Sequence, residues 1–180
     1  MESVILVLLP LLPLAAALLL AFFPDEKKEL FQQVTLGVMS ACLMGVIFLF
    51  LRFPIGDSGY HFVFRKEWLP ALGISYQVGL DGIGMTLVLL LALVSTSGAF
   101  VSLWIRERVK EYMIFYLILV ASIYGVFTSL DLFFLYLFYE MSVIPMYPLI
   151  GIWGSQNKEY ASMKLTVYIT TGAVLALAGI

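Results

Sequence analysis

The sequence has very few of the residues from which disulfide frameworks and metal sites are built. Among 180 residues there is one cysteine, Cys42, and one histidine, His61. A single cysteine cannot form an internal disulfide, and one cysteine with one histidine falls short of a structural zinc site. We therefore expect neither a disulfide scaffold nor a metal centre.

Charge is also scarce. Asp, Glu, Lys and Arg make up 12% of the residues, about half the share in an ordinary soluble domain. The net charge is −2 and the ten basic residues are scattered, which excludes the concentrated basic surface of a nucleic-acid-binding protein. Apolar residues make up 62% of the chain and the mean hydropathy is +1.03. These values predict a membrane protein.

Six apolar stretches predict transmembrane helices, because each is close to the roughly 20 residues that cross a hydrocarbon core of about 30 Å. A helix satisfies its own backbone hydrogen bonds, which lipid cannot do. The predicted fold is all-α, a polytopic transmembrane helix bundle that forms a single membrane domain over residues 1–180. The predicted spans are about 3–23, 30–51, 82–105, 111–130, 131–153 and 160–180.

The flanks of the first and last spans lead to two further expectations. Ala15, Ala16 and Ala17 resemble the cleavage region of a signal peptide. However, Glu2 precedes this span and lysines follow it, which reverses the charge order of a signal, so we expect a retained helix. The last span reaches Ile180 without a polar flank. This ending predicts that the biological chain continues as a longer protein.

Basic residues are distributed unequally between alternate connections, and this predicts the orientation of the chain. Three of them, Arg52, Arg65 and Lys66, follow the second span. By the positive-inside rule, the side with more basic residues faces the cytoplasm. The N-terminus is therefore expected to lie outside. The other seven lie in or beside the connections after the first, third and fifth spans: Lys27, Lys28, Arg106, Arg108, Lys110, Lys158 and Lys164.

The connection from Arg52 to Leu80 is the only long one. It contains prolines, glycines and a strand-like stretch from Tyr60 to Phe64, which predicts a short extracytoplasmic hairpin between spans two and three. Its aromatic residues suit the membrane interface better than a ligand site. These are Tyr60, Trp68 and Tyr76.

The fifth span holds an acidic residue near its centre. Glu140 follows Asp131 by nine residues, which is about 13–14 Å along a helix and close to the membrane midplane. An isolated carboxylate there costs at least about 2.5–3.5 kcal/mol. The carboxyl is therefore either protonated or in a hydrated interior with a cationic partner. A group that alternates between these states is a proton relay, and a neutral glutamate that only links helices is the alternative.

Two prolines, Pro145 and Pro148, follow Glu140 in the same span. A proline removes an amide donor, so the carbonyl groups of Met141 and Ile144 lose their usual partners. We predict a helix bend on the cytoplasmic side of Glu140 that draws water toward the acid. A bend that serves packing alone is the alternative.

Lys164 is the second candidate inside a span. From Tyr160 it is only about 6 Å deep, so its side chain can reach the headgroups by snorkelling, or it can belong to the proton path. Its depth differs from that of Glu140 by roughly 15 Å. We therefore expect no direct ion pair without intervening water.

Asp81 and Asp131 occupy equivalent positions immediately before the third and fifth spans. An aspartate oxygen can accept hydrogen bonds from the free amides of a helix start, and its charge suits that end of the helix dipole. We predict that both residues are helix N-caps.

Three segments carry a family resemblance: GLDGIGMTLVLL from Gly79, DLFFLYLFYEMSVIPMYPLIGIWG from Asp131 and EYASMKLTVYITTG from Glu159. They resemble the antiporter-like, proton-conducting membrane subunits of respiratory complex I, the NADH:quinone oxidoreductase. The step from Glu140 through IPMY to LIGIWG is typical of the M type, also called subunit 4. The resemblance covers the chain in order, and the first two helices are similar mainly in character.

The resemblance implies that Glu140 is the essential acid of the fifth helix, which modulates a lysine on the seventh. Family members have many more helices, so that lysine and the later residues of the proton path are absent from this sequence. The chain alone is therefore not expected to conduct protons. Lys164 matches a lysine often present at the start of the sixth helix.

The implied function is proton translocation coupled to electron transfer from NADH to quinone, by a multi-pass subunit of a prokaryotic inner membrane. The chain has neither a glycine-rich phosphate loop nor a set of cysteines, so NADH, flavin, iron–sulfur clusters and quinone are expected on other subunits. The implied partners are other membrane subunits, especially the L-type and N-type chains, together with the lipid bilayer.

Two alternatives share the helix pattern. One is a subunit of a cation/proton antiporter or of a membrane-bound hydrogenase-type complex. The other is a non-catalytic membrane scaffold in which Glu140 only holds helices together.

Overall fold

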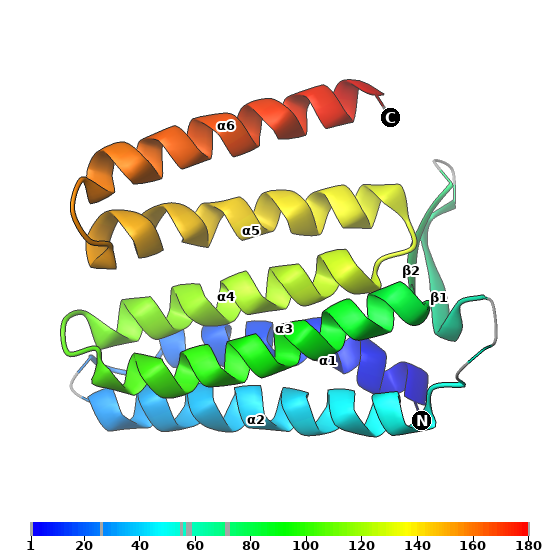
Figure 1. The fold of residues 1–180 in the computed structure, drawn as a ribbon, viewed down its shortest axis with the longest axis horizontal. Coiled ribbons are helices and arrows are strands. Elements are labelled where there is room, and N and C mark those ends of the chain that lie inside the picture. The colour runs from blue at the N-terminus through cyan, green and yellow to red at the C-terminus, as the bar shows by residue number, and fades with distance from the viewer. Residues whose placement is uncertain (1, 26, 55, 57–58, 71–72, 180) are drawn as a thin grey trace.

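Six long α-helices account for most of the chain in the computed structural model, which describes residues 2–25, 27–54, 56, 59–70 and 73–179. Within these residues each of the six helices is long and apolar enough to cross a membrane, which confirms the six predicted spans. They run side by side (Figure 1) as α1 (Glu2–Ala21), α2 (Lys28–Arg52), α3 (Gly82–Val101), α4 (Val109–Thr128), α5 (Leu132–Trp153) and α6 (Lys158–Gly179).

The core lies where the first four helices meet. α4 packs against α1, α2 and α3, whereas α5 packs on α4 and α6 packs chiefly on α5. The last two helices therefore extend the bundle outward from α4 (Figure 1). The largest fully buried side chains come from the inner helices and include Leu6, Phe31, Met39, Met85, Met113 and Tyr124.

Close approach between helices rests on small residues. The helices are apolar on nearly every side, and lipid provides no hydrophobic drive for helix association, so tight packing decides which faces meet. A Cβ atom on Gly98 of α3 would lie 2.6 Å from the hydroxyl of Tyr116 on α4. The ring of Phe138 on α5 occupies the space that a Cβ atom on Gly125 of α4 would need. These two glycines let α3 and α5 approach α4.

An antiparallel hairpin separates α2 from α3. It is formed by β1 (His61–Leu69) and β2 (Ile74–Leu80), with Arg65 opposite Gln77. The hairpin predicted between spans two and three is therefore present. It lies at the same end of the bundle as the described N-terminal residues (Figure 1).

The hairpin aromatics differ in their surroundings. Tyr60 is exposed, as an interfacial residue would be. Trp68 is exposed as well, but its ring and that of Tyr76 pack edge-to-face on Phe134 at the start of α5, with ring centroids 6.0 and 5.1 Å from that of Phe134. Burial raises the pKa of the Tyr76 hydroxyl. Through its ring contact with Phe134, Tyr76 helps to hold the hairpin against α5. The sequence did not indicate this role.

Alternate connections lie at opposite ends of the bundle. The α1–α2, α3–α4 and α5–α6 connections are together at one end, and the hairpin and the α4–α5 turn are at the other (Figure 1). A short 3-10 turn, η2 (Ser102–Trp104), leads from α3 into the α3–α4 connection. This arrangement agrees with the grouping used to count basic residues. Which end faces the cytoplasm stays a prediction from that count.

The contact between Gly125 and Phe138 yields a stability prediction. Gly125→Ala should lower the thermal unfolding midpoint of the detergent-purified protein, because the added methyl group must displace the Phe138 ring, at a cost of about 1–3 kcal/mol. The matched control is Gly172→Ala on α6, where nothing lies within 4 Å of the added atom. Equal midpoints for both variants would show that α4 and α5 do not approach closely here.

Candidate functional site

Glu140 lies in a groove between α5 and α6. The groove has a volume of about 530 Å³, and the Glu140 side chain is half-buried. The site is therefore a cleft between two antiparallel helices, and the acid does not project from an isolated helix face. The lining residues are Leu137, Glu140, Met141, Val143, Ile144 and Tyr147 of α5, with Thr166 and Thr170 of α6.

Hydroxyl groups are the polar neighbours that α6 contributes to this groove. Glu140 is about 20 Å from the Trp153 end of α5, and Thr170 is about 18 Å from the Lys158 start of α6, so the two residues lie at similar depth. Thr166 donates its own proton to the carbonyl oxygen of Ser162 at 2.9 Å, which leaves its oxygen free to accept. The volume also greatly exceeds the roughly 30 Å³ that one water occupies.

Charge is absent from the immediate surroundings of Glu140 in the described part of the chain. The three ion pairs there are Glu2–Arg52, Asp25–Lys110 and Arg108–Glu111, all near helix ends. Among the described residues that line the groove, most are apolar, two are threonines, and none besides Glu140 is charged.

Lys164 faces away from this groove. Its ammonium lies over the rings of Tyr160 and Tyr168, with centroid distances of 5.7 and 5.9 Å. Around the helix axis, Thr166 and Thr170 are roughly 200° and 240° from Lys164. The structure therefore does not bring together the two residues predicted for the proton path, in agreement with the expectation that they form no direct ion pair.

The two prolines lie within the uninterrupted helix α5, and Pro145 is buried. The carbonyls that they leave without an amide donor belong to Met141 and Ile144, and both of these residues line the Glu140 groove. The sequence had related the prolines to Glu140 only by their spacing. The bend itself and its effect on hydration stay predictions.

Asp81 and Asp131, the two expected N-caps, occupy these positions at α3 and α5. The Asp81 carboxylate accepts a hydrogen bond from the Gly84 amide at 2.6 Å, and Asp131 accepts from the amides of Phe133 and Phe134 at 2.9 and 3.4 Å. The second oxygen of Asp131 also accepts from the Ser75 amide of the hairpin at 3.1 Å.

The hairpin makes further contacts with the turn before α5. The Leu130 amide donates to the Gln77 carbonyl at 2.8 Å, and Val78 forms an isolated bridge with Ser129. Together with Asp131, these bonds attach the start of the acid-bearing helix to a two-stranded sheet.

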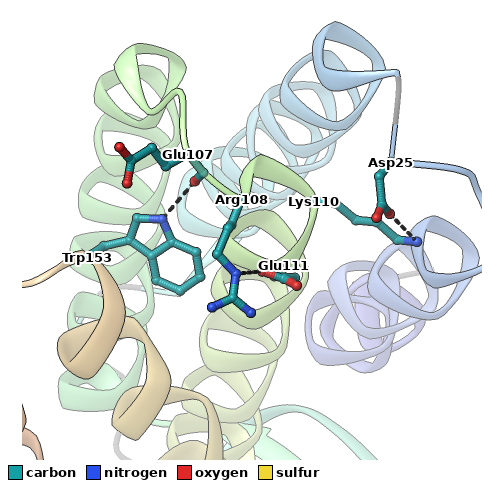
Figure 2. Close-up of polar contacts among 6 residues, drawn as sticks. All are labelled: Asp25, Glu107, Arg108, Lys110, Glu111 and Trp153. Atoms are coloured by element: carbon teal, nitrogen blue, oxygen red, sulfur yellow. Dashed lines mark hydrogen bonds and ion pairs between the residues drawn. The ribbon is translucent and has the colours of Figure 1, made fainter.

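The far end of α5 is also held by specific contacts. Figure 2 shows the Trp153 indole nitrogen donating to the Glu107 carbonyl oxygen, at 2.9 Å. The Trp153 ring also packs edge-to-face on Tyr112, with centroids 5.2 Å apart. The contact of Trp153 could not be predicted from the sequence, because an aromatic residue at a helix end is typical of the membrane interface.

Charged residues at the start of α4, and the one just before it, form ion pairs. Figure 2 shows Lys110 paired with Asp25 of the α1–α2 connection, at 2.9 Å. Arg108, the residue just before α4, donates to Glu111 in the first turn of that helix, and this hydrogen bond raises the pKa of the Arg108 guanidinium. The pairing of Lys110 with Asp25 links the start of α4 to the α1–α2 connection, which is far away in the sequence.

A family model matches the last two helices. Residues 129–180 match the family described as NADH:quinone oxidoreductase/Mrp antiporter, TM. The matched segment includes α5, α6 and the whole lining of the Glu140 groove. The description names both oxidoreductase and antiporter proteins, so it does not separate the two.

Curated relatives extend the similarity to nearly the whole chain. NADH-quinone oxidoreductase subunit M of Rickettsia prowazekii is 34% identical over 170 residues, which are 92% of this chain and 35% of the relative. NAD(P)H-quinone oxidoreductase chain 4 of Trichodesmium erythraeum is 34% identical over 168 residues, covering 93% of this chain and 30% of the relative. The chain thus spans about a third of the length of these relatives.

Solved structures share the fold. A chain of respiratory complex I from Thermus thermophilus superposes with a TM-score of 0.78 and 24% identity, covering 96% of this chain and 34% of that one. A chain of an archaeal membrane-bound sulfane sulfur reductase superposes with a TM-score of 0.73 and 21% identity, covering 99% and 27%.

In sequence and fold the chain is similar to membrane subunits of NADH:quinone oxidoreductases. Within that class, its similarity is to the proteins named subunit M in Rickettsia and chain 4 in cyanobacteria. The six apolar helices make the chain a multi-pass membrane protein, and these similarities confirm the resemblance seen in the sequence motifs.

The double role of Asp131 yields a prediction. Asp131→Ala should destabilise the protein by about 1–2 kcal/mol through the loss of the α5 cap, and should also loosen the hairpin by removing the acceptor of the Ser75 amide. Amide hydrogen exchange should therefore rise in both β2 and the first turn of α5. Asp81→Ala is the matched control, because that side chain accepts from α3 alone. Faster exchange confined to α5 would contradict the link.

Proposed function

We propose that this chain is part of an M-type, proton-translocating subunit of an NADH:quinone oxidoreductase, with Glu140 as a protonatable group of its proton path. The single observation that supports this most strongly is the position of Glu140, halfway along α5 in a groove that has hydroxyl groups and room for water. An ionisable residue inside a membrane helix is most often functional.

The proposed mechanism follows from the surroundings of the carboxyl. In an apolar groove the neutral acid is favoured, and the entry of water or the approach of a cation favours the carboxylate. A change in hydration or in a neighbouring charge therefore makes Glu140 take up or release a proton. Thr166 and Thr170 offer oxygen atoms at the groove wall, where they can hydrogen-bond to the protonated acid or to water.

Lys164 occupies a separate place in this proposal. It lies between Tyr160 and Tyr168 on the face of α6 that is turned away from the groove. It can therefore contribute to the proton path only through groups beyond α6, or it can act as an interfacial anchor. The prolines Pro145 and Pro148 contribute by leaving two carbonyls of groove-lining residues free to bind water.

The remaining assignments extend the family resemblance and the count of basic residues. The proposed setting is a prokaryotic inner membrane with the N-terminus outside, in line with bacterial relatives and the distribution of basic residues. NADH, flavin, iron–sulfur clusters and quinone are assigned to other subunits of the complex. The proposed neighbours are other membrane subunits, in particular the L-type and N-type chains.

A second candidate function is supported by the family description and by one fold match. The family description includes Mrp antiporters, and the sulfane sulfur reductase chain has the same fold. A subunit of a cation/proton antiporter or of a hydrogenase-type complex would use the same carboxyl with another driving reaction. A scaffold without a proton path is the third possibility.

The test replaces Glu140 with Gln in the complete complex. NADH-driven proton pumping into inverted membrane vesicles should fall at least about tenfold, because the amide cannot release a proton. Glu107→Gln is the matched control, since only the main-chain carbonyl of Glu107 makes a contact there, and it should pump normally.

The alternatives give different results in the same experiment. Full pumping by an assembled Glu140→Gln complex would exclude the proposed role. A smaller amount of assembled complex with an unchanged pumping rate for each complex would indicate a scaffold. Sodium or potassium exchange without NADH oxidation in the unaltered protein would favour the antiporter.

A further inference from the structure

The core of the bundle contains a tyrosine hydroxyl that makes no hydrogen bond to the described residues. Tyr124 of α4 is fully buried, and its hydroxyl has no partner among them. A serine or threonine hydroxyl can turn to a carbonyl of its own helix, as those of Ser122 and Thr128 on α4 do. The rigid ring of a tyrosine holds its hydroxyl away from the main chain. The Tyr124 hydroxyl therefore needs a partner from elsewhere.

Two hydrogen bonds between helices show how α2, α3 and α4 meet near this hydroxyl. The Tyr116 hydroxyl of α4 donates to the Ser95 carbonyl oxygen of α3 at 2.6 Å. The Thr96 hydroxyl of α3 donates to the Met39 carbonyl oxygen of α2 at 3.2 Å. Side chains lean toward the N-terminus of their helix. Tyr124, about two turns beyond Tyr116, therefore reaches back toward the level of Ser95.

Buried polar side chains lie beside the Tyr124 hydroxyl. The Ser95 hydroxyl of α3 and the Cys42 thiol of α2 are close to it, and both residues are 3% exposed. Ser95 donates its proton to the Ala92 carbonyl oxygen at 3.3 Å, so its own oxygen remains free to accept. Ser95 is about 20 Å from the start of α3, and Cys42 is about 21 Å from the start of α2. Three helices thus place polar atoms together near the middle of the bundle.

A water molecule suits these groups. A buried water typically makes about three hydrogen bonds to polar groups that otherwise lack partners. Two hydroxyls and a thiol supply both donors and acceptors. The residues that α2 and α3 contribute at this level, Cys42, Ala92 and Ser95, have small side chains and are all buried. They leave more room beside the Tyr124 hydroxyl than leucines would.

We propose that Tyr124, Ser95 and Cys42 hold an internal water molecule where α2, α3 and α4 meet. The Tyr124 hydroxyl donates to the water oxygen, the water donates to the Ser95 hydroxyl oxygen, and the Cys42 thiol lines the site. A bond through water joins two helices nearly as well as a direct one. It gives apolar helices a polar contact that fixes their rotation. The site does not depend on the function proposed for Glu140.

The test uses X-ray footprinting of the protein in the intact complex, extracted in mild detergent. X-rays create hydroxyl radicals from every water molecule, including those inside a protein, and mass spectrometry maps the oxidised residues. Met39 and Cys42 are buried but should be oxidised, because sulfur reacts readily with a radical formed beside it. The matched control is Met85, which is equally buried and about 15 Å along α3 from Ser95. It should stay unmodified.

Two tyrosine variants separate a bound water from an unpaired hydroxyl. Tyr124→Phe should abolish the oxidation of Met39 and Cys42. It should leave the thermal unfolding midpoint unchanged or lower, because removing a satisfied hydroxyl gives no gain, whereas removing an unpaired buried hydroxyl stabilises. Tyr116→Phe, which loses a direct hydrogen bond, should lower the midpoint and leave the oxidation in place.

Four results would overturn the proposal. The first is oxidation of Met39 and Cys42 no greater than that of Met85. The second is oxidation that persists in Tyr124→Phe. The third is a higher unfolding midpoint for Tyr124→Phe, which would show that the hydroxyl is unpaired. The fourth is alkylation of Cys42 by N-ethylmaleimide in the folded complex, which would show a cleft open to bulk solvent.

Discussion

A carboxyl group halfway along a membrane helix requires polar surroundings that hydrocarbon cannot provide, and this constraint explains much of the arrangement of α5. Glu140 lines the α5–α6 groove, to which α6 contributes two threonines. The carbonyls freed by the two prolines belong to residues of the same groove.

The position of that groove depends on contacts at both ends of α5. At one end Asp131 caps the helix and accepts the Ser75 amide of the hairpin. At the other end the Trp153 indole donates to the Glu107 carbonyl. Phe138 on Gly125 fixes the side that faces α4.

The architecture could be predicted from the sequence, whereas the direction in which each side chain points could not. Long apolar runs specify spans because lipid demands closed backbone hydrogen bonding, and the spacing from Asp131 was enough to place Glu140 near mid-span. The helices are apolar nearly all round, so no polar stripe indicates their rotation. The sequence pattern therefore could not show that Lys164 turns away from Glu140. The contact of Trp153 with Glu107 joins residues far apart in the sequence, and no local pattern marks it.

The central claim is that the Glu140 carboxyl changes its protonation during turnover in a hydrated groove. Infrared difference spectroscopy of membranes that contain the complete complex measures this directly, with the Glu140 carbonyl stretch identified by its loss in Glu140→Gln. The account predicts a band that changes intensity when NADH oxidation begins and that shifts in D₂O. A band that stays constant during turnover and is insensitive to D₂O would contradict it.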